Sequence, residues 1–410
     1  MKKGIFFAAV LSATIFFAGC WNDVFYSVRR DVPPEDATVS GNITSITRYT
    51  VSKEEYLVLS ADSGVRYKKA DESGHGNWKT LVTDSLPFKF HSYDYFAETH
   101  NGEQLIKILA DSTTLYLVTA AFSNDDAEGI SKPSAIKLYG AEISDWDEIG
   151  SNDWTTIIGE SESSKYFPTS QRQDDYYYRT EFGIFQTNAP QQNHRKAYIR
   201  TDSSDVTYYE LCGTAEPKKT TVVPQEVKVD PSVANCAKSA VWFGGKVVFF
   251  NTSASTTNET YNTPATHFYY AVSETVYHST EFGKKEKSLT AGNVVSALMT
   301  CNDALIIGQG NFDAYSSTSS SGGIRKTSLK DGVPGSKTVD FKTNASDQID
   351  NAYCVMALLN ATPDKKEEES DLYAAITYMG TGNSSSSSGG SAKNIGLWSY
   401  YRDRGNWNRE

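Results

Sequence analysis

Leu115-Tyr-Leu-Val-Thr119 is a short run that is apolar at nearly every position, as in a β-strand buried on both faces. Five similar runs occur along the chain, and the starts of successive runs lie 57 to 68 residues apart. The other five are Tyr56-Leu-Val-Leu-Ser60, Phe182-Gly-Ile-Phe-Gln186, Val247-Val-Phe-Phe-Asn251, Ala304-Leu-Ile-Ile-Gly308 and Leu372-Tyr-Ala-Ala-Ile376. Self-similarity at a period of this length indicates a repeat architecture.

Further strand patterns surround each of these runs. A second strand follows every run, as Val65–Lys68 and Ala135–Tyr139 illustrate, and most repeats carry a weaker third. In three repeats another strand precedes the run, and a turn dipeptide such as Gly244-Gly245 separates the two. The third repeat has no evident first strand before Tyr176–Tyr178.

Four strands per unit, repeated six times, predict an all-β fold in which residues 41–410 form a β-propeller of six four-stranded blades. The 25 Tyr and 19 Phe residues favour strands over helices. One alternative is a seventh blade formed within residues 84–110. The others are a pair of β-sandwiches and a solenoid with irregular repeats.

Long polar insertions occur in four of the repeats. They are expected between the second and third strands, at residues 123–133, 251–266, 311–322 and 380–394. In a propeller, equivalent connections emerge on the same face, and loops on a rigid scaffold are where binding sites are usually built. The alternative is that Ser- and Gly-rich tracts such as Ser384–Ser388 are simply solvated.

The first 19 residues have the pattern of an export signal. Lys2 and Lys3 precede the apolar stretch Ile5–Phe17, which is too short to span a bilayer as a helix. Residues 1–19 are therefore predicted to be a signal peptide. No other long apolar run occurs in the sequence, so a membrane-spanning segment is not expected.

Phe17-Ala-Gly-Cys20 resembles the lipobox of bacterial lipoproteins, although Phe17 stands where Leu is usual. The resemblance implies that Cys20 is lipidated, with palmitate-type acyl chains anchoring the chain in the membrane. The alternative is an ordinary signal peptide with an incidental cysteine. Trp21 and Asn22 follow Cys20 with no Asp, which in such lipoproteins favours the outer membrane of the cell envelope.

Residues 20–40 are interpreted as a tether. Within them, Val24–Val28 is a candidate strand that closes the ring by joining the last blade. Among the remaining cysteines, Cys212 and Cys236 flank a proline-containing connection, and a disulfide between them would pin a loop of about 25 residues. Cys301 and Cys354 lie at the ends of apolar strands, as buried thiols often do.

The net charge and the missing motifs argue against several classes of function. The formal net charge of −11 and the absence of a basic patch argue against nucleic-acid binding. The sequence contains no nucleophile elbow, zinc-protease motif or phosphate loop. The six histidines are scattered without ligand spacing, and the acidic clusters Asp125–Glu128 and Asp145–Glu148 lack a calcium-loop pattern, so no metal or cofactor is expected.

Gly76-Asn77-Trp78 and Gly405-Asn406-Trp407 resemble a degraded Asp-box turn of sialidase-type propellers. In that family the motif is structural, and its Trp packs between blades. Catalysis there needs an arginine cluster, a tyrosine nucleophile with an acidic partner and an aspartic acid. Arg48 is the residue placed where one such arginine could lie, whereas Arg66, Arg200 and Arg325 suit packing or salt bridges.

No catalytic residues are assigned on this basis. The sequence predicts a lipid-anchored envelope propeller that serves as a non-catalytic binding or scaffold module for a protein or glycan partner. The alternative is a sialidase-like or other glycan-processing hydrolase on the same fold.

Overall fold

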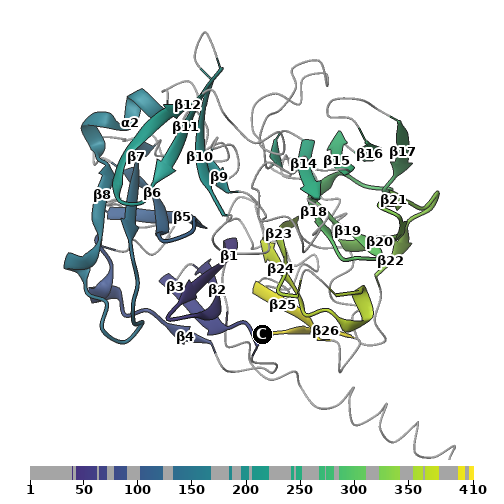
Figure 1. The fold of residues 1–410 in the computed structure, drawn as a ribbon, viewed down its shortest axis with the longest axis horizontal. Helices are drawn as coiled ribbons and strands as arrows, with labels where there is room; N and C mark the ends of the chain where they lie inside the picture. The colour runs from purple at the N-terminus through teal and green to yellow at the C-terminus, as the bar shows by residue number, and fades with distance from the viewer. Residues whose placement is uncertain are drawn as a thin grey trace, which may run out of the picture. The chain divides into compact units, whose positions relative to one another are not determined.

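A computed structural model of the chain describes the following residues: 39, 43–61, 64–71, 78–89, 102–122, 133–167, 184–186, 195–202, 206–220, 242–243, 246–251, 267–272, 274–280, 286–310, 323–341, 354–362, 365–377, 396–401 and 406–410. They belong to one compact unit, Thr38–Glu410. The predicted all-β class is confirmed: within these residues every strand pairing is antiparallel, and six sheets form in chain order (Figure 1). None of the helices among them is long and apolar enough to cross a membrane.

The first three sheets take up the N-terminal half of the chain. Sheet 1 contains β1 (Ile43–Val51), β2 (Glu54–Ala61), β3 (Gly64–Lys69) and β4 (Lys79–Thr80), followed by the 3-10 turn η1 (Thr83–Ser85). Sheet 2 contains β5 (Gly102–Ala110), β6 (Leu115–Phe122), β7 (Pro133–Ala141) and β8 (Thr155–Ile158), with η2 (Ser151–Asp153) before β8 and α2 (Glu160–Tyr166) after it. Sheet 3 contains β9 (Ile184–Gln186), β10 (Ala197–Asp202), β11 (Val206–Cys212) and β12 (Ala215–Thr220).

The last three sheets repeat the pattern with small additions. Sheet 4 contains β13 (Trp242–Phe243), β14 (Lys246–Asn251), β15 (His267–Val272), β16 (Thr275–Ser279) and β17 (Lys287–Thr290). Sheet 5 contains β18 (Val295–Thr300), β19 (Ala304–Gln309) and β20 (Gly323–Lys330), on which β21 (Val333–Pro334) and β22 (Val339–Asp340) both pair. Sheet 6 contains β23 (Cys354–Asn360), β24 (Leu372–Thr377), β25 (Gly396–Tyr401) and β26 (Asn406–Arg409), with η5 (Glu367–Glu369) before β24.

The six apolar runs all form strands, but their positions within the sheets differ. In sheets 1, 2, 5 and 6 the run is the second strand, as predicted. In sheet 3 it is β9, the first strand of the described ladder. A run buried on both faces has the same pattern in either position, so the sequence pattern alone could not separate them.

The apolar run of sheet 4 also differs in position from the runs of sheets 1, 2, 5 and 6. Its strand β14 contacts β18, the first strand of sheet 5, while its last strand β17 leads directly into β18. The ladder β14 to β17 therefore matches the four strands of the other sheets, and β13 is an addition before it. Residues 252–266 join β14 to β15, the second and third strands of the sheet, as predicted. Because β14 lies where the other sheets have their first strands, this insertion corresponds in position to their first-to-second connections.

Of the segment considered for a seventh blade, residues 84–89 and 102–110 are described. Gly102–Ala110 is β5, which pairs along its length with β6 and begins sheet 2.

The first strands of the sheets contact one another in series. Strand β5 contacts β9 and β1, β1 contacts β23, and β18 contacts both β23 and β14. The amide of Ile108 donates to Ser45 Oγ at 2.6 Å, and the Tyr49 hydroxyl donates to the Thr113 carbonyl at 2.7 Å. These two contacts show that β1 and β5 run in the same direction.

Five apolar clusters fill the spaces between consecutive sheets, namely between sheets 1 and 2, 2 and 3, 4 and 5, 5 and 6, and 6 and 1. In β2, Val58 packs toward sheet 2, while Leu57 and Leu59 pack toward sheet 6. Burying one such side chain contributes roughly 1.5–3 kcal/mol. Each sheet in the middle of this series is thus held on both faces.

Three tryptophans occupy equivalent places where the fourth strand starts. Trp78 and Trp407, the residues of the two Asp-box-like tripeptides, lie in the clusters between sheets 6 and 1 and between sheets 5 and 6. Their predicted packing between sheets is confirmed. Trp154, whose indole N–H donates to the Ser85 carbonyl at 2.9 Å, joins sheets 2 and 1 in the same way. The tripeptide that ends at Trp154 is Asn152-Asp153-Trp154, without the glycine of the other two, so the sequence pattern did not mark it.

A buried ion pair joins the first sheet to the last. Lys68 Nζ lies 3.5 Å from Glu410 Oε2, and both side chains have no solvent exposure. Trp78 Nε1 donates to the same carboxylate at 2.7 Å, and the Tyr401 hydroxyl donates to its other oxygen. Lys68 Nζ also donates to Tyr401 Oη at 2.7 Å.

Aromatic faces surround the same ammonium. Its nitrogen lies 5.7 Å from the ring centres of Trp78 and Tyr373 and 5.2 Å from that of Tyr401, within range of cation–π attraction. The amide of Val39 donates to the Glu410 carbonyl at 3.1 Å, which brings the chain before β1 to the end of sheet 6. The predicted closing strand Val24–Val28 lies outside the described residues and stays a prediction.

We expect Glu410→Gln to lower the free energy of unfolding by about 3 kcal/mol, because it leaves the buried Lys68 charge without its counter-charge. Lys68→Met combined with Glu410→Gln should be more stable than Glu410→Gln alone, since no unpaired charge then remains. Lys69→Met is the matched control, because Lys69 pairs with Glu54 at the exposed surface, and its stability should stay close to wild type. Urea denaturation measures the free energy of unfolding of wild type and the three variants, and a double variant no more stable than Glu410→Gln alone would contradict the coupling.

Candidate functional site

Arg48, the arginine singled out from the sequence, lies buried on β1 within a three-residue cluster. Its Nη1 is 3.7 Å from Glu55 Oε2, and Arg195, just before β10, also pairs with Glu55. Arg195 Nη1 donates to the Arg48 carbonyl at 2.9 Å, linking sheets 3 and 1. Two guanidinium groups therefore share one carboxylate, and the place that a substrate carboxylate would need is taken by Glu55.

The other arginines considered from the sequence are not brought to this cluster. Arg325 lies on β20, where its Nε is 3.4 Å from Asp340. Arg66 lies on β3 and is half-buried, and this burial lowers the pKa of its guanidinium group. The side chain of Arg200 lies outside the described residues. No pattern in the sequence marked Arg195, which lies at the end of a connection.

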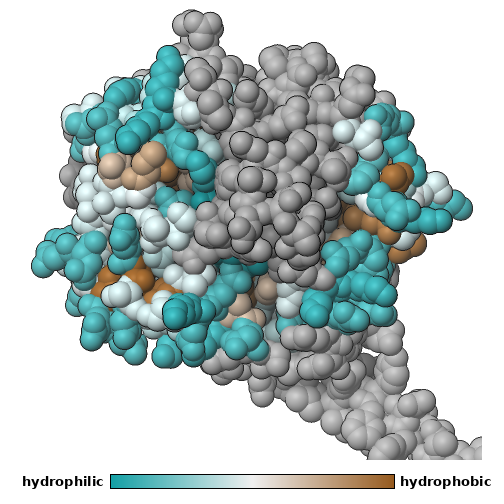
Figure 2. Space-filling view, in the orientation of Figure 1, coloured by the Kyte–Doolittle hydropathy of each residue, from teal (hydrophilic) through white to brown (hydrophobic). Residues whose placement is uncertain are grey.

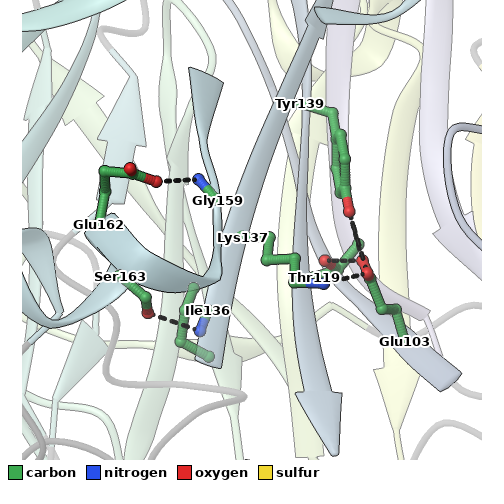
Figure 3. A network of polar contacts seen from close by, with 8 residues as sticks. All are labelled: Glu103, Thr119, Ile136, Lys137, Tyr139, Gly159, Glu162 and Ser163. Carbon is green, nitrogen blue, oxygen red and sulfur yellow. Dashed lines mark hydrogen bonds and ion pairs between the residues drawn. The ribbon is translucent and has the colours of Figure 1, made fainter. Parts of the chain in front are cut away.

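Glu103, at the start of β5, is the centre of a second polar cluster (Figure 3). Its carboxylate accepts hydrogen bonds from Thr119 Oγ1 at 2.7 Å and from the Tyr139 hydroxyl at 2.8 Å, and it pairs with Lys137 Nζ at 2.8 Å. These partners come from β6 and β7, so hydrogen bonds link three adjacent strands of sheet 2. They lie near the end of β6 and the start of β7, the two strands that residues 123–132 connect.

A tyrosine next to a carboxylate resembles part of the hydrolase requirement, but its electrostatics oppose that role. Burial first, and the Glu103 charge second, raise the pKa of Tyr139 above its ordinary value. Tyr139 is therefore held as a neutral phenol that donates to Glu103. Figure 3 also shows Ser163 of α2 facing the backbone of Ile136, whose amide donates to Ser163 Oγ at 2.8 Å and fixes the helix to β7.

Thr47, Lys107 and Gln186 form a third cluster, called here the inner-strand cluster because its members lie on β1, β5 and β9. Gln186 Nε2 donates to Thr47 Oγ1 at 2.7 Å, and the amide of Ala110 donates to Gln186 Oε1 at 2.7 Å. Lys107 Nζ donates to the Ile184 carbonyl at 2.7 Å. First strands of three sheets therefore meet through polar side chains.

Lys107 differs from the other lysines described so far because the hydrogen bond described for it goes to a neutral carbonyl. Desolvation lowers the pKa of Lys107 to about 8. A desolvated ammonium is suited to accept an anionic group of a ligand, because a counter-charge removes part of the desolvation penalty. The inner-strand cluster is accordingly the candidate binding position on the first strands.

The remaining predicted site residues stay untested. Cys20 and Cys236 lie outside the described residues. Cys212 is a half-buried free thiol whose pKa is raised by burial and by Glu210, so the disulfide with Cys236 stays a prediction. In the described part of the chain no group of three His, Cys, Asp or Glu residues is placed to hold a metal ion.

Three of the four polar insertions also occupy equivalent positions in their sheets. Residues 123–132, 311–322 and 378–395 each join the second strand of a sheet to the third, at β6–β7, β19–β20 and β24–β25. The last residues of β18 and β23 lie together, since Asn360 Nδ2 donates to the Thr300 carbonyl at 3.0 Å. Sheets 5 and 6 are therefore aligned, and their insertions leave at the same edge.

The described surface around these positions is largely polar. Hydrophilic residues cover much of it in Figure 2, and hydrophobic residues gather in small patches. Val82, Val333 and Val339 are the exposed large hydrophobic residues in the part of the chain that the structure describes. Scattered single side chains of this kind are normal for a protein surface.

Lys107→Met should raise the free energy of unfolding at pH 7 by roughly 1–2 kcal/mol, because the desolvation penalty outweighs one lost hydrogen bond. The folded chain releases the Lys107 proton near pH 8, whereas the unfolded chain keeps it to about pH 10.5, so wild-type stability rises between these values. The advantage of Lys107→Met should therefore shrink by pH 10, as urea denaturation at both pH values would measure. Lys337→Met, at an exposed position, is the control and should leave stability unchanged. A stability gain of Lys107→Met that is the same at both pH values would contradict the lowered pKa of Lys107.

Comparisons with known proteins give no family. No protein-family model matches the chain, and no curated protein matches it. A crystal structure of BBS1N in complex with ARL6DN is similar with a TM-score of 0.38 and 11% identity, covering 88% of this chain and 92% of that chain. A glycosyl hydrolase from Bacteroides ovatus has a TM-score of 0.30 and 8% identity, covering 89% and 85%. The GH43 endo-arabinanase from Bacillus licheniformis has a TM-score of 0.30 and 13% identity, covering 73% and 99%. Similarities this low do not assign a function.

Proposed function

We propose that the chain is a lipid-anchored β-propeller of the cell envelope that binds a protein or glycan partner without catalysing a reaction. The six sheets would be the blades of the propeller. This is supported by the serial contacts between first strands and by the five apolar clusters between consecutive sheets. Burial of both sheet faces is what a ring of blades provides.

The observation that carries the binding role is the common placement of three insertions. Residues 123–132, 311–322 and 378–395 are long, polar and attached between second and third strands. Connections of that type leave their sheets at one edge, so the three would form a continuous polar surface on a rigid support. We assign the partner to this surface, with the inner-strand cluster beside it.

Binding is favoured over catalysis by the state of the ionisable groups. The carboxylate of Glu55 is held by two arginines, and that of Glu103 by Lys137, Thr119 and Tyr139. A general acid or base needs a proton it can exchange near neutral pH. Carboxylates engaged in this way act as structural counter-ions.

The partner surface can be tested by site-specific photo-crosslinking in intact cells. A photoreactive phenylalanine analogue at Tyr315, within residues 311–322, should give discrete crosslinked products, because this position lies on the assigned surface. The same analogue at Tyr261, within residues 252–266, is the matched control, since that insertion corresponds in position to a first-to-second connection at the opposite edge. Equal products from both positions, or cleavage of host or envelope glycans by the purified chain, would overturn the proposal.

The anchor is tested separately. Cells fed an alkyne-tagged fatty acid should label the wild-type chain, and Cys20→Ala should lose the label and leave the membrane fraction, because the thiol is the proposed acylation site. Cys212→Ala is the control and should keep the label. Labelling of Cys20→Ala would show that the chain is not anchored through Cys20.

A further inference from the structure

His267 and His278 form a close imidazole pair between β15 and β16. His267 Nδ1 lies 2.9 Å from His278 Nε2, and the ring centres are 5.2 Å apart with an angle of 22° between the planes. A hydrogen bond between two imidazoles needs an N–H on one ring and a lone pair on the other. Both rings cannot be fully protonated while this bond exists.

The burial of His278 decides which protonation state the pair prefers. His278 is 3% exposed, and its Nδ1 has no hydrogen-bond partner among the residues that the structure describes. A neutral His278 that donates from Nε2 leaves only a lone pair at Nδ1. A protonated His278 would place a charged N–H there without an acceptor, which is far more costly. The geometry therefore favours a neutral pair.

The pair also connects two sheets. The imidazole of His267 packs against Gly332 so closely that a Cβ at Gly332 would lie 2.3 Å from the ring. Gly332 has a φ of +77° and follows Asp331 in the turn between β20 and β21 of sheet 5. The Tyr269 hydroxyl of β15 donates to the Gly332 carbonyl. His267 is the first residue after the 252–266 connection, so the contact fixes the end of that connection to sheet 5.

Charged groups near the pair come from two places in the fold. Glu286 and Lys287 lie at β17, with Lys287 opposite His278 in the ladder, and Asp331 lies in the sheet 5 turn. Desolvation lowers the pKa of both rings, and His267 and Lys287 lower that of His278 further, to about 4, against the opposing effect of Glu286. Because these values lie below that of an unfolded histidine, the stabilisation present at neutral pH is lost as the pH falls from about 6.5 toward 4.

We propose that the His267–His278 pair is an acid-sensitive latch between sheets 4 and 5. Toward pH 5, proton uptake by the pair disrupts the hydrogen bond between the rings, and the start of β15 separates from the Gly332 turn. The 252–266 connection is then released at its C-terminal end while the rest of the chain stays folded. This inference does not depend on the identity of any partner.

Limited proteolysis tests the latch with an internal reference. The full chain in detergent is digested briefly with proteinase K at pH 7.5 and 5.0, and cleavage within residues 252–266 is divided by cleavage within residues 378–395. The ratio should rise at least fivefold at pH 5.0 in the wild type. The double variant His267→Gln with His278→Gln has no imidazole left in the pair to take up a proton, so its ratio should differ less than twofold between the two pH values. His100→Gln, which lies outside the pair, should respond as the wild type does.

A constant wild-type ratio, or a pH response kept by the double variant, would overturn the latch. Should the double variant fail to fold, the wild type still decides the question. NMR titration of chains labelled at the histidine Cε1 positions should place at least one of these two histidines below pH 5.5. Two ordinary titrations at or above pH 6.5 would also overturn the proposal.

Discussion

Burial of both faces of sheets 1, 2, 5 and 6 is the constraint on which the rest of this structure depends. A strand such as β2, in which successive residues pack toward different neighbours, cannot end in solvent on either side without exposing apolar area. Each of these four sheets therefore needs two neighbours, and the chain meets this need by placing its sheets in series. The first and last sheets satisfy it through each other, which explains why the most thoroughly buried ion pair described, Lys68 with Glu410, lies between them.

The charged groups buried between sheets have a common chemistry. Each such contact described above includes a counter-charge: Glu410 for Lys68 and Glu55 for Arg195. Aromatic hydroxyls and indoles complete the hydrogen bonding, as Tyr401 and Trp78 do for Glu410. Such pairs add directional preference to apolar packing, because an unpaired partner in the same place would be strongly unfavourable. Lys107 and the His267–His278 pair depart from this rule, and they are the positions to which we assign function.

The sequence predicted the all-β class, the six repeated apolar runs and the insertion sites in sheets 2, 5 and 6. Hydrophobic period and turn dipeptides are local signals, and they were enough for these features. The order of strands in sheets 3 and 4 could not be predicted from local signals. A run such as Val247–Asn251 is equally apolar whether it is the first or the second strand, and its contact with β18 decides its position. The residues of the candidate sites were even harder to predict from the sequence. Arg195, Lys107 and the paired histidines acquire their roles from partners on other strands, and Trp154 lacks the glycine that marked the other two tryptophans.

In five of the six described sheets the outermost strand is short, with two residues in β4 and β22 and four in β8, β17 and β26, whereas β12 of sheet 3 has six. A long free edge would offer rows of unpaired amides and carbonyls to any other chain nearby. Short edges remove that template, and Lys residues such as Lys79 and Lys287 add charge along it. Copies of this protein held side by side at high local density should therefore resist edge-to-edge association, so crowding on a surface need not lead to aggregation.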